Sequence, residues 1–227
     1  MTKTSLQRRS WLRQAGWVGS TTLAGAAGLL GIIGRVLAAG DTTALQGMRR
    51  LVGEVTINGR PARADARVNP GDSVETGAGA EAVYVIGRDA FLQRANSRVS
   101  FGDSAAAGVL RVVTGRLLSV FDRGQRRIET PTAIIGIRGT GCYIEAAAAR
   151  VYFCLCYGEA ELIPTVSPQE KEVYRTRHHD RPMYIYSDMA MPKMAVPAEV
   201  INHTDAELVL LEALVGRQPP FQDYGKY

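Results

Sequence analysis

Between about residues 49 and 163 the chain alternates short apolar runs with turn-forming residues and shows no helical period of useful length. Glu54-Val55-Thr56-Ile57 alternates polar and apolar side chains, and the Asn58-Gly59 that follows is typical of a type I′ hairpin turn. Similar runs recur about every 8–12 residues, at 83–86, 109–113, 116–121, 133–137, 142–146 and 151–157. The pattern predicts a mainly β protein with a single all-β domain, built as a solenoid-like structure, a roll or a sandwich.

The pattern changes after residue 163. Residues 164–200 are interrupted by five prolines, which predicts an irregular segment, with Tyr184-Ile185-Tyr186 as a candidate for one more strand. Thr204-Asp205-Ala206-Glu207 has the form of a capping box, and Leu208, Leu211 and Val215 follow with helical spacing. We therefore expect one helix at about 205–215 within a C-terminal extension of 164–227, with an apolar face that covers the β domain or binds a partner.

The N-terminal segment, residues 1–38, resembles a twin-arginine export signal. Arg8 and Arg9 form the pair, Trp11 and Leu12 take the apolar positions after it, and residues 15–34 are uncharged and rich in Gly and Ala. Small residues at the end of the segment predict cleavage after residue 38, and an uncleaved inner-membrane anchor is the alternative. We expect the protein in the periplasm.

The formal net charge of +5 comes from this segment alone. Five of the 27 basic residues lie in residues 1–38, which contain no acid, so the rest of the chain carries 22 basic residues against 22 acidic ones. A nucleic-acid-binding protein would carry its excess positive charge on the folded domain. We therefore expect no nucleic-acid partner.

Several blocks of the β region, taken in order, resemble FecR domains. Residues 69–77, Asn-Pro-Gly-Asp-Ser-Val-Glu-Thr-Gly, are similar to the family's PGD-x-V-x-TG block, and residues 130–140 are similar to its TP-x-A-x-x-x-V-R-GT block. Residues 114–116 and 158–160 are similar to a strand and to the closing turn of the family. The resemblance covers residues 49–163 and implies an all-β periplasmic domain, solenoid-like or roll-like.

In the best-known members of this family a cytosolic segment regulates a sigma factor, and the periplasmic part senses an outer-membrane transporter. Only about 14 residues precede the apolar segment of this chain, so we expect the folded module without the anti-sigma segment. The resemblance implies a binding or scaffolding module at the cell envelope, with a role in signalling. Its partner would be an envelope protein or a small ligand.

The three cysteines, Cys142, Cys154 and Cys156, fall on two adjacent predicted strands. A four-residue loop at 147–150 places Leu155 opposite Cys142, and a shift of one residue brings Cys154 or Cys156 there instead. Because periplasmic thiols tend to oxidise, a disulfide between Cys142 and either Cys154 or Cys156 is one expectation. A three-thiolate metal site is the other, since Cys154 and Cys156 point to the same face of their strand.

Other soft or imidazole ligands follow in the extension. Met189, Met191 and Met194 are spaced like a thioether copper motif, and His178 and His179 add imidazoles. We expect no obligatory cofactor. If a metal is bound, we expect copper or iron, held by the cysteines together with these side chains.

Signatures of common enzyme classes are missing from the sequence, including the Gly-x-Ser-x-Gly, Walker, Rossmann and zincin motifs. We therefore expect a non-enzymatic, exported FecR-like protein that binds a partner or ligand at the envelope. A periplasmic metal-binding protein that uses the cysteine cluster is the alternative. Membrane contact would come only through an uncleaved signal segment.

Overall fold

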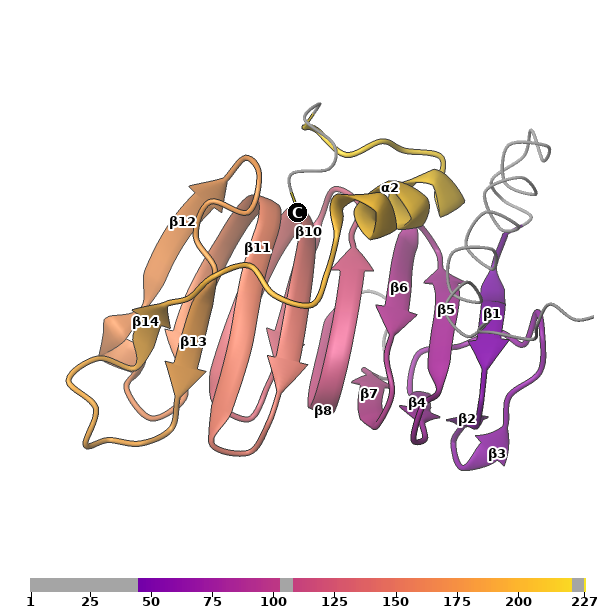
Figure 1. The fold of residues 1–227 in the computed structure, drawn as a ribbon, viewed down its shortest axis with the longest axis horizontal. Helices are drawn as coiled ribbons and strands as arrows, with labels where there is room; N and C mark the ends of the chain where they lie inside the picture. Colours follow the sequence, from indigo (N-terminus) through magenta and orange to yellow (C-terminus); the bar gives the residue numbers. More distant parts are fainter. Residues whose placement is uncertain (1–44, 103–107, 222–226) are drawn as a thin grey trace, which may run out of the picture.

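The computed structural model describes residues 45–102, 108–221 and 227, so the predicted export signal lies outside the described residues. The described chain is mainly β, as predicted, and forms one sheet of 14 strands (Figure 1). It also contains the short 3₁₀ helix η2 (Pro168–Glu170) and the helix α2 (Asp205–Leu214). The strands are β1 (Gly47–Val52), β2 (Val55–Ile57), β3 (Arg60–Pro61), β4 (Ser73–Thr76), β5 (Glu81–Ile86), β6 (Asp89–Gln93), β7 (Ser97–Phe101), β8 (Val109–Val120), β9 (Gln125–Glu129), β10 (Ala133–Ala146), β11 (Arg150–Pro164), β12 (Glu172–Thr176), β13 (Met183–Tyr186) and β14 (Ala195–Pro197).

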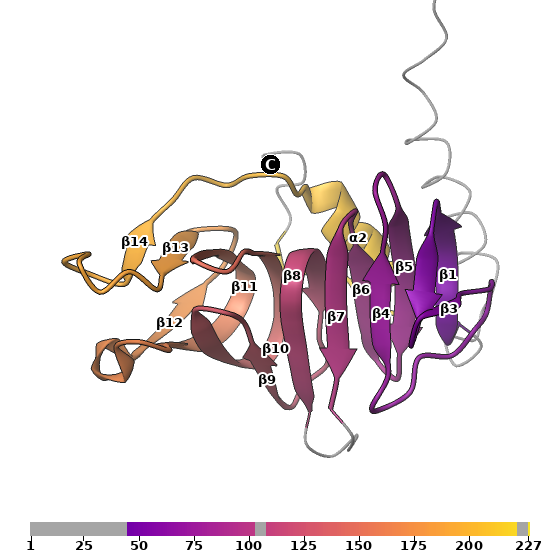
Figure 2. The same ribbon diagram turned by 90° about the horizontal axis from the view of Figure 1, so that it is seen from below.

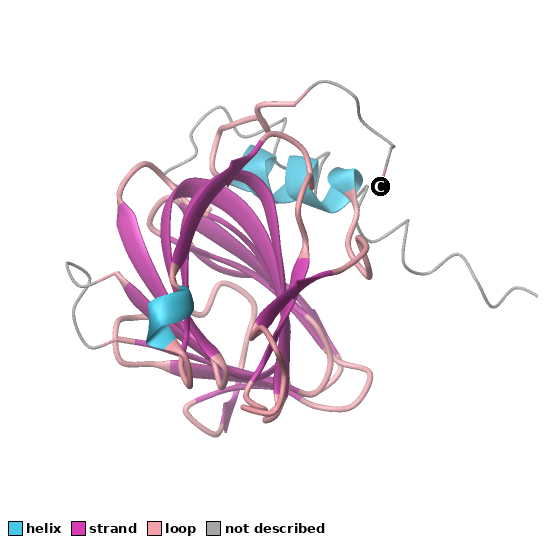
Figure 3. Ribbon diagram, turned by 90° about the vertical axis from the view of Figure 1, so that its left-hand side faces the viewer, coloured by secondary structure: helices cyan, strands magenta, loops and turns pink. Residues whose placement is uncertain are grey.

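Three long strands, β8, β10 and β11, make the sheet fold back on itself. The first half of β8 pairs with β7 and β9, and its second half pairs with β6 and β10. In β11 the first half pairs with β13 and the second half with β12. Each long strand therefore belongs to two layers, and the sheet wraps around an interior (Figure 3). We call the layer that contains β1, β5, β6, β13 and β14 the first layer, and the one that contains β2, β3, β4, β7, β9 and β12 the second layer.

The interior between the two layers holds the larger apolar core. The first layer contributes Tyr84, Phe91 and Phe153, and the rings of Tyr84 and Phe91 stack with their centroids 5.1 Å apart. The second layer contributes side chains such as Val99 and Ile128, which are fully buried. Each large apolar side chain buried in this way contributes about 1.5–3 kcal/mol, which makes this core the main source of stability for the roll.

A second apolar core lies on the outer face of the first layer, under α2. The helix crosses the outside of this layer (Figures 1 and 2). Its side chains Leu208, Leu211 and Leu214 are fully buried against the outward-facing residues of the first layer. Those outward-facing residues include Val83, Val85, Leu92, Leu118 and Val120.

The helix follows its sequence signals closely. The structure starts α2 at Asp205 and ends it at Leu214, against an expected span of about 205–215. The predicted capping box is confirmed, because the Thr204 hydroxyl accepts from the Glu207 N–H at 3.4 Å and the Glu207 carboxylate accepts from the Thr204 N–H at 3.0 Å. Among the described residues, no helix is both long enough and apolar enough to span a bilayer.

The extension is more regular than expected. Residues 164–200 supply β12 and β13, which pair with the two halves of β11, and β14, which pairs with β13. The strand β13 agrees with the candidate strand at 184–186, whereas the prediction of an irregular segment is wrong for β12 and β14. The reason is that β11 is 15 residues long and bent, so each half offers a free edge to a different returning strand.

Candidate metal centre

The hairpin of β10 and β11 separates the three cysteines. Its register pairs Ala146 with Val151 and places Leu155 opposite Cys142, as a four-residue loop predicts. Cys142 therefore lies in the interior core, whereas Cys154 and Cys156 lie in the core under α2. All three cysteines are free in the structure. The disulfide between Cys142 and either partner is not formed, and neither is a three-thiolate site.

Cys142 has a structural environment. Its thiol is fully buried and contacts the Ser119 hydroxyl at 3.4 Å. Burial in this apolar interior raises the pKa of the Cys142 thiol to about 12. The thiol therefore stays protonated and behaves as a small apolar side chain.

Cys154 and Cys156 have a spacing that suits a metal better than a disulfide. Residues two apart on a strand are separated by about 6.6 Å along its axis, whereas a disulfide needs Cβ atoms about 3.5–4.5 Å apart. Pairing with β10 holds this part of β11 on one side, with Cys154 opposite Tyr143. The two sulfurs nevertheless lie within 4.8 Å of each other. They can share one ion without any movement of the strand.

His179 comes to these sulfurs from the turn after β12. Its backbone has a positive φ of 53°, and its N–H donates to the Cys156 carbonyl at 2.9 Å. The Asp180 carboxylate shapes the turn by accepting from the Arg177 N–H at 2.7 Å. The ring of His179 is 2% exposed, and its Nδ1 lies 3.4 Å from the Cys154 sulfur.

The side chain of His203 joins the same cluster as Cys154, Cys156 and His179. Its position just before the N-cap of the helix indicates an exposed side chain. It precedes the N-cap residue Thr204, yet it is only 4% exposed. Its ring stacks on Tyr143 with centroids 4.5 Å apart, and its Nε2 lies 3.1 Å from Nδ1 of His179. The local signals that define α2 do not reveal this contact, because it depends on the path of residues 198–202 over the sheet.

The four side chains form a compact buried set of ligand atoms. The sulfurs of Cys154 and Cys156 and a ring nitrogen of His179 and of His203 all lie within 4.8 Å of one another. In a tetrahedral zinc site, nitrogen ligands lie roughly 3.3 Å apart and a nitrogen and a sulfur roughly 3.6 Å apart, from the usual bond lengths. The observed 3.1 Å and 3.4 Å contacts are close to these values.

Hydrogen-bond acceptors outside the cluster indicate which nitrogen of His179 and of His203 carries the ring proton. Nε2 of His179 lies 3.2 Å from the Asp205 carboxylate, and Nδ1 of His203 lies 2.6 Å from the Ile201 carbonyl. Both partners only accept hydrogen bonds, so these nitrogens carry the protons. The remaining nitrogens, Nδ1 of His179 and Nε2 of His203, then face each other with bare lone pairs. Such an arrangement needs a cation between them, either a proton or a metal ion.

The thiols are electrostatically distinct. The hydrogen bond from the Cys156 thiol, with further help from His179 and His203, holds the pKa of Cys154 well below its usual range despite burial. Burial, together with the neighbouring Cys154 sulfur, raises the pKa of Cys156 well above its usual range. Of the two thiols, Cys154 therefore loses its proton more readily, and a thiolate is the form that binds a metal ion.

Asp205 orients the site from outside. As the first residue of α2, it contacts His179 as described and Nε2 of His178 at 2.8 Å. The His178 ring also stacks on Phe221 with centroids 4.1 Å apart. His178 therefore stands in the outer shell and not among the four convergent ligand atoms, whereas the predicted ligand His179 is among them. A carboxylate behind a ligand histidine is a recurrent feature of metal sites.

The methionines lie elsewhere. Met189 is 75% exposed. The N–H of Met191 donates to the Asp188 carbonyl at 3.1 Å, and the carbonyl of Met194 accepts from the Tyr186 N–H at 2.9 Å, at the far end of β13. Within residues 45–102, 108–221 and 227, no contact joins these three side chains to the cysteines and histidines of the cluster. The structure does not bring the thioethers to this site.

No model of a known protein family matches this chain, and no curated protein sequence is similar to it. Among solved structures, two crystal structures of a "putative anti-sigma factor" from Parabacteroides distasonis ATCC 8503, at 2.50 Å and 1.65 Å resolution, resemble it in fold. Each has a TM-score of 0.45 and 9% sequence identity, and the likeness covers 56% of this chain. This chain spans 58% of the length of that protein. A likeness of this extent assigns no activity or partner.

Proposed function

We propose that this protein is an exported, non-enzymatic β-domain protein that binds one zinc ion through Cys154, Cys156, His179 and His203. The observation that carries the proposal is the convergence of two cysteine sulfurs and two ring nitrogens, all buried and all within 4.8 Å of one another. Thiol and imidazole ligand atoms gathered in this way in a buried site match the ligand set of structural zinc.

Charge and ligand type favour zinc. Two thiolates neutralise a divalent ion, whereas monovalent copper would leave a net negative charge among side chains that are at most 4% exposed. Two sulfur and two imidazole ligands in a closed set are typical of structural zinc sites. The copper expectation depended in part on Met189, Met191 and Met194, which do not contribute here.

A closed site supports a structural or sensing role. Four protein ligands fill a tetrahedral shell, so no position is left for a substrate or an activated water. The twin-arginine-like segment with Arg8 and Arg9 supports export of the folded chain. Export in the folded state would allow the ion to enter in the cytosol, and coordination would then protect both thiols from oxidation in the periplasm.

Metal analysis of the purified full chain tests the proposal. We expect one zinc ion per wild-type chain and less than a tenth of that in Cys154→Ala and His203→Ala. Cys142→Ala is the matched control, because it also removes a buried thiol but from the interior core. It should keep its zinc. Stoichiometric copper would overturn the choice of metal, and a wild-type chain that neither contains zinc nor binds added Zn²⁺ would overturn the site.

A further inference from the structure

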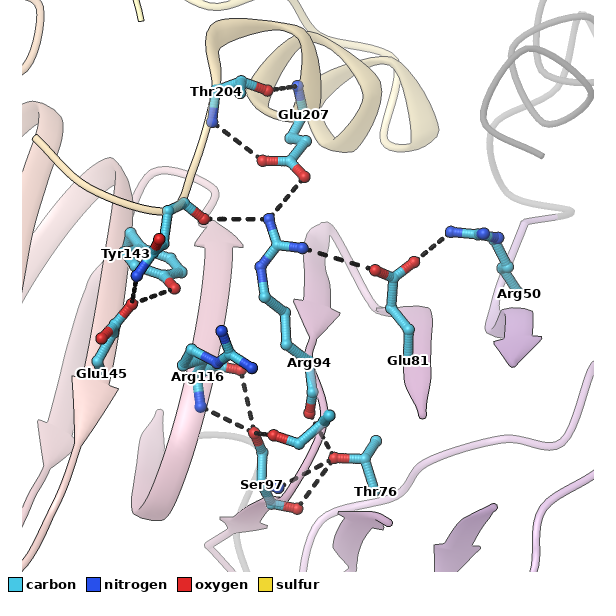
Figure 4. A network of polar contacts seen from close by, with 12 residues as sticks. Arg50, Thr76, Glu81, Arg94, Ser97, Arg116, Tyr143, Glu145, Thr204 and Glu207 are labelled. Carbon is cyan, nitrogen blue, oxygen red and sulfur yellow. Dashed lines mark hydrogen bonds and ion pairs between the residues drawn. The ribbon is translucent and has the colours of Figure 1, made fainter. Parts of the chain in front are cut away.

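The helix α2 is tied to the first layer at its N-terminus by two separate sets of polar contacts. One set is the candidate metal centre, which includes His203, two residues before the helix, and Asp205, its first residue. The other set is centred on Arg94 of the turn after β6 (Figure 4). The two sets differ in what they require. The first gathers side chains that can bind a metal ion, and the second consists of ion pairs and hydrogen bonds between protein groups.

The Arg94 set holds the helix by ordinary ion pairs and hydrogen bonds. The Arg94 guanidinium donates to the Asn202 carbonyl at 3.1 Å and to the Glu207 carboxylate at 2.7 Å. The Asn202 amide in turn donates to Glu145 at 2.7 Å (Figure 4). These contacts position the first turn of α2, and none of them involves a residue of the metal centre.

The metal centre joins three segments that the sheet does not join. Cys154 and Cys156 belong to β11, His179 belongs to the turn between β12 and β13, and His203 belongs to the connection between β14 and α2. A bound ion would link all three directly. Asp205 adds a link from the helix itself to the rings of His178 and His179.

Backbone hydrogen bonds constrain these three segments to different extents. Both cysteines lie on a strand that is paired along its length. His203 lies in an irregular connection, next to Asn202 with a positive φ of 56°. Loss of the ion would remove the direct link between His203 and the two cysteines of β11. The segment that can move away at least cost is the one that carries His203 and leads directly into α2.

We propose that metal occupancy latches α2 onto the first layer, so that loss of the ion frees the helix and uncovers the apolar face beneath it. This inference depends on the proposed zinc site and adds a consequence to it. The face beneath consists of outward side chains of β5, β6 and β8 that α2 keeps at 2% exposure or less, namely Val83, Val85, Leu92, Leu118 and Val120. The ion would thereby control whether this surface is available.

Hydrogen exchange of the full chain, with and without zinc, tests the latch. We expect the amides of residues 208–215 to exchange at least tenfold faster after zinc is removed by a chelator, and to recover when Zn²⁺ is added back. The β2–β3 hairpin, which lies far along the sheet path from the metal centre, serves as an internal control and should not change. A dye that binds exposed apolar surface should report the same reversible change.

Two variants distinguish the effect of zinc on α2 from the binding of zinc itself. The double variant Cys154→Ala/Cys156→Ala should show the fast exchange of α2 whether or not zinc is present. Glu207→Gln weakens the Arg94 set but keeps all ligands, so its exchange should still respond to zinc. Equal exchange of α2 in the zinc-loaded and zinc-free wild type, with one zinc bound in the loaded form, would overturn the latch and leave the site intact. Failure to bind zinc would overturn both.

Discussion

Asp205 is the residue whose single carboxylate connects the metal centre with α2. It is 1% exposed and accepts from the rings of both His178 and His179. In this position it fixes the His179 tautomer that leaves Nδ1 free for a metal. The contribution of such an outer carboxylate is to pre-organise the ligand and to raise its basicity.

We therefore predict that Asp205→Asn lowers the affinity for Zn²⁺ by about 10–100-fold, measured by competition with a chelating indicator. Glu207→Gln is the matched control, because it makes the same change of charge two residues later on the helix without touching a ligand. It should leave the affinity within about twofold of wild type. Equal losses in the two variants would show that the effect is one of general charge and not of orientation.

The two thiols predict a pH dependence of metal binding. The pKa of Cys156 is raised, so in the metal-free protein its thiol keeps its proton at neutral pH and zinc must displace it. The affinity should therefore rise with pH, by about tenfold per pH unit for each proton displaced. Competition titrations at two pH values near neutrality measure this slope. An affinity that does not change with pH would contradict direct coordination by Cys156.

At the scale of elements, α2 owes its position to apolar contacts as well as to its polar ties. Leu211 is fully buried against the first layer, so Leu211→Ala should lower the free energy of unfolding by about 2–5 kcal/mol. Denaturant unfolding of zinc-saturated protein measures the loss. Val209→Ala on the partly exposed side of the helix is the control, with an expected loss below about 1 kcal/mol. A loss that small in Leu211→Ala would mean that the helix contributes little to the fold.

Local signals were sufficient for the β region of residues 49–163, for α2 and for half of the site, but not for β12 and β14. The Asn58-Gly59 turn has the positive φ values that its residues predict, 51° and 73°. The loop length of the β10–β11 hairpin sets the register that places Leu155 opposite Cys142, and the two-residue spacing on β11 places Cys154 and Cys156 on the same face. In the same way, the capping box marks the start of α2.

The rest of the site depends on the path of the chain in space. His203 and Asp205 join the cysteines because residues 198–202 return across the outer face of the first layer, and no local period encodes that return. The expectation of a disulfide with Cys142 failed for a related reason. A strand alternates its faces, so Cys142 opposite Leu155 must point away from Cys154 and Cys156.

On the scale of the whole molecule, one folded sheet carries two cores with different tasks. The interior core closes the roll, and the outer core holds α2 over the metal centre. The strands from residues 164–200 extend the same sheet, so the C-terminal extension and residues 49–163 share one framework. The proposed metal centre lies where these two parts of the chain meet, so an ion bound there would contact both.

The proposed export of this folded molecule depends on Arg8 and Arg9, outside the described residues. Replacing both by Lys should leave the protein folded in the cytosol, because recognition of paired guanidinium groups is not reproduced by ammonium groups. Cell fractionation measures the distribution. Arg13→Lys, which alters a nearby base of the same segment, is the control and should reach the periplasm. Normal periplasmic levels of the double variant would contradict a twin-arginine signal.

The central claim concerns which atoms surround the ion, and X-ray absorption at the zinc K-edge of the zinc-loaded full chain measures this directly. We predict a shell of two sulfur atoms at about 2.3 Å and two nitrogen atoms at about 2.0–2.1 Å. Removal of Cys156 by Cys156→Ala should reduce the sulfur count to one. A shell of light atoms only, without sulfur, would show that zinc binds elsewhere and would contradict the account.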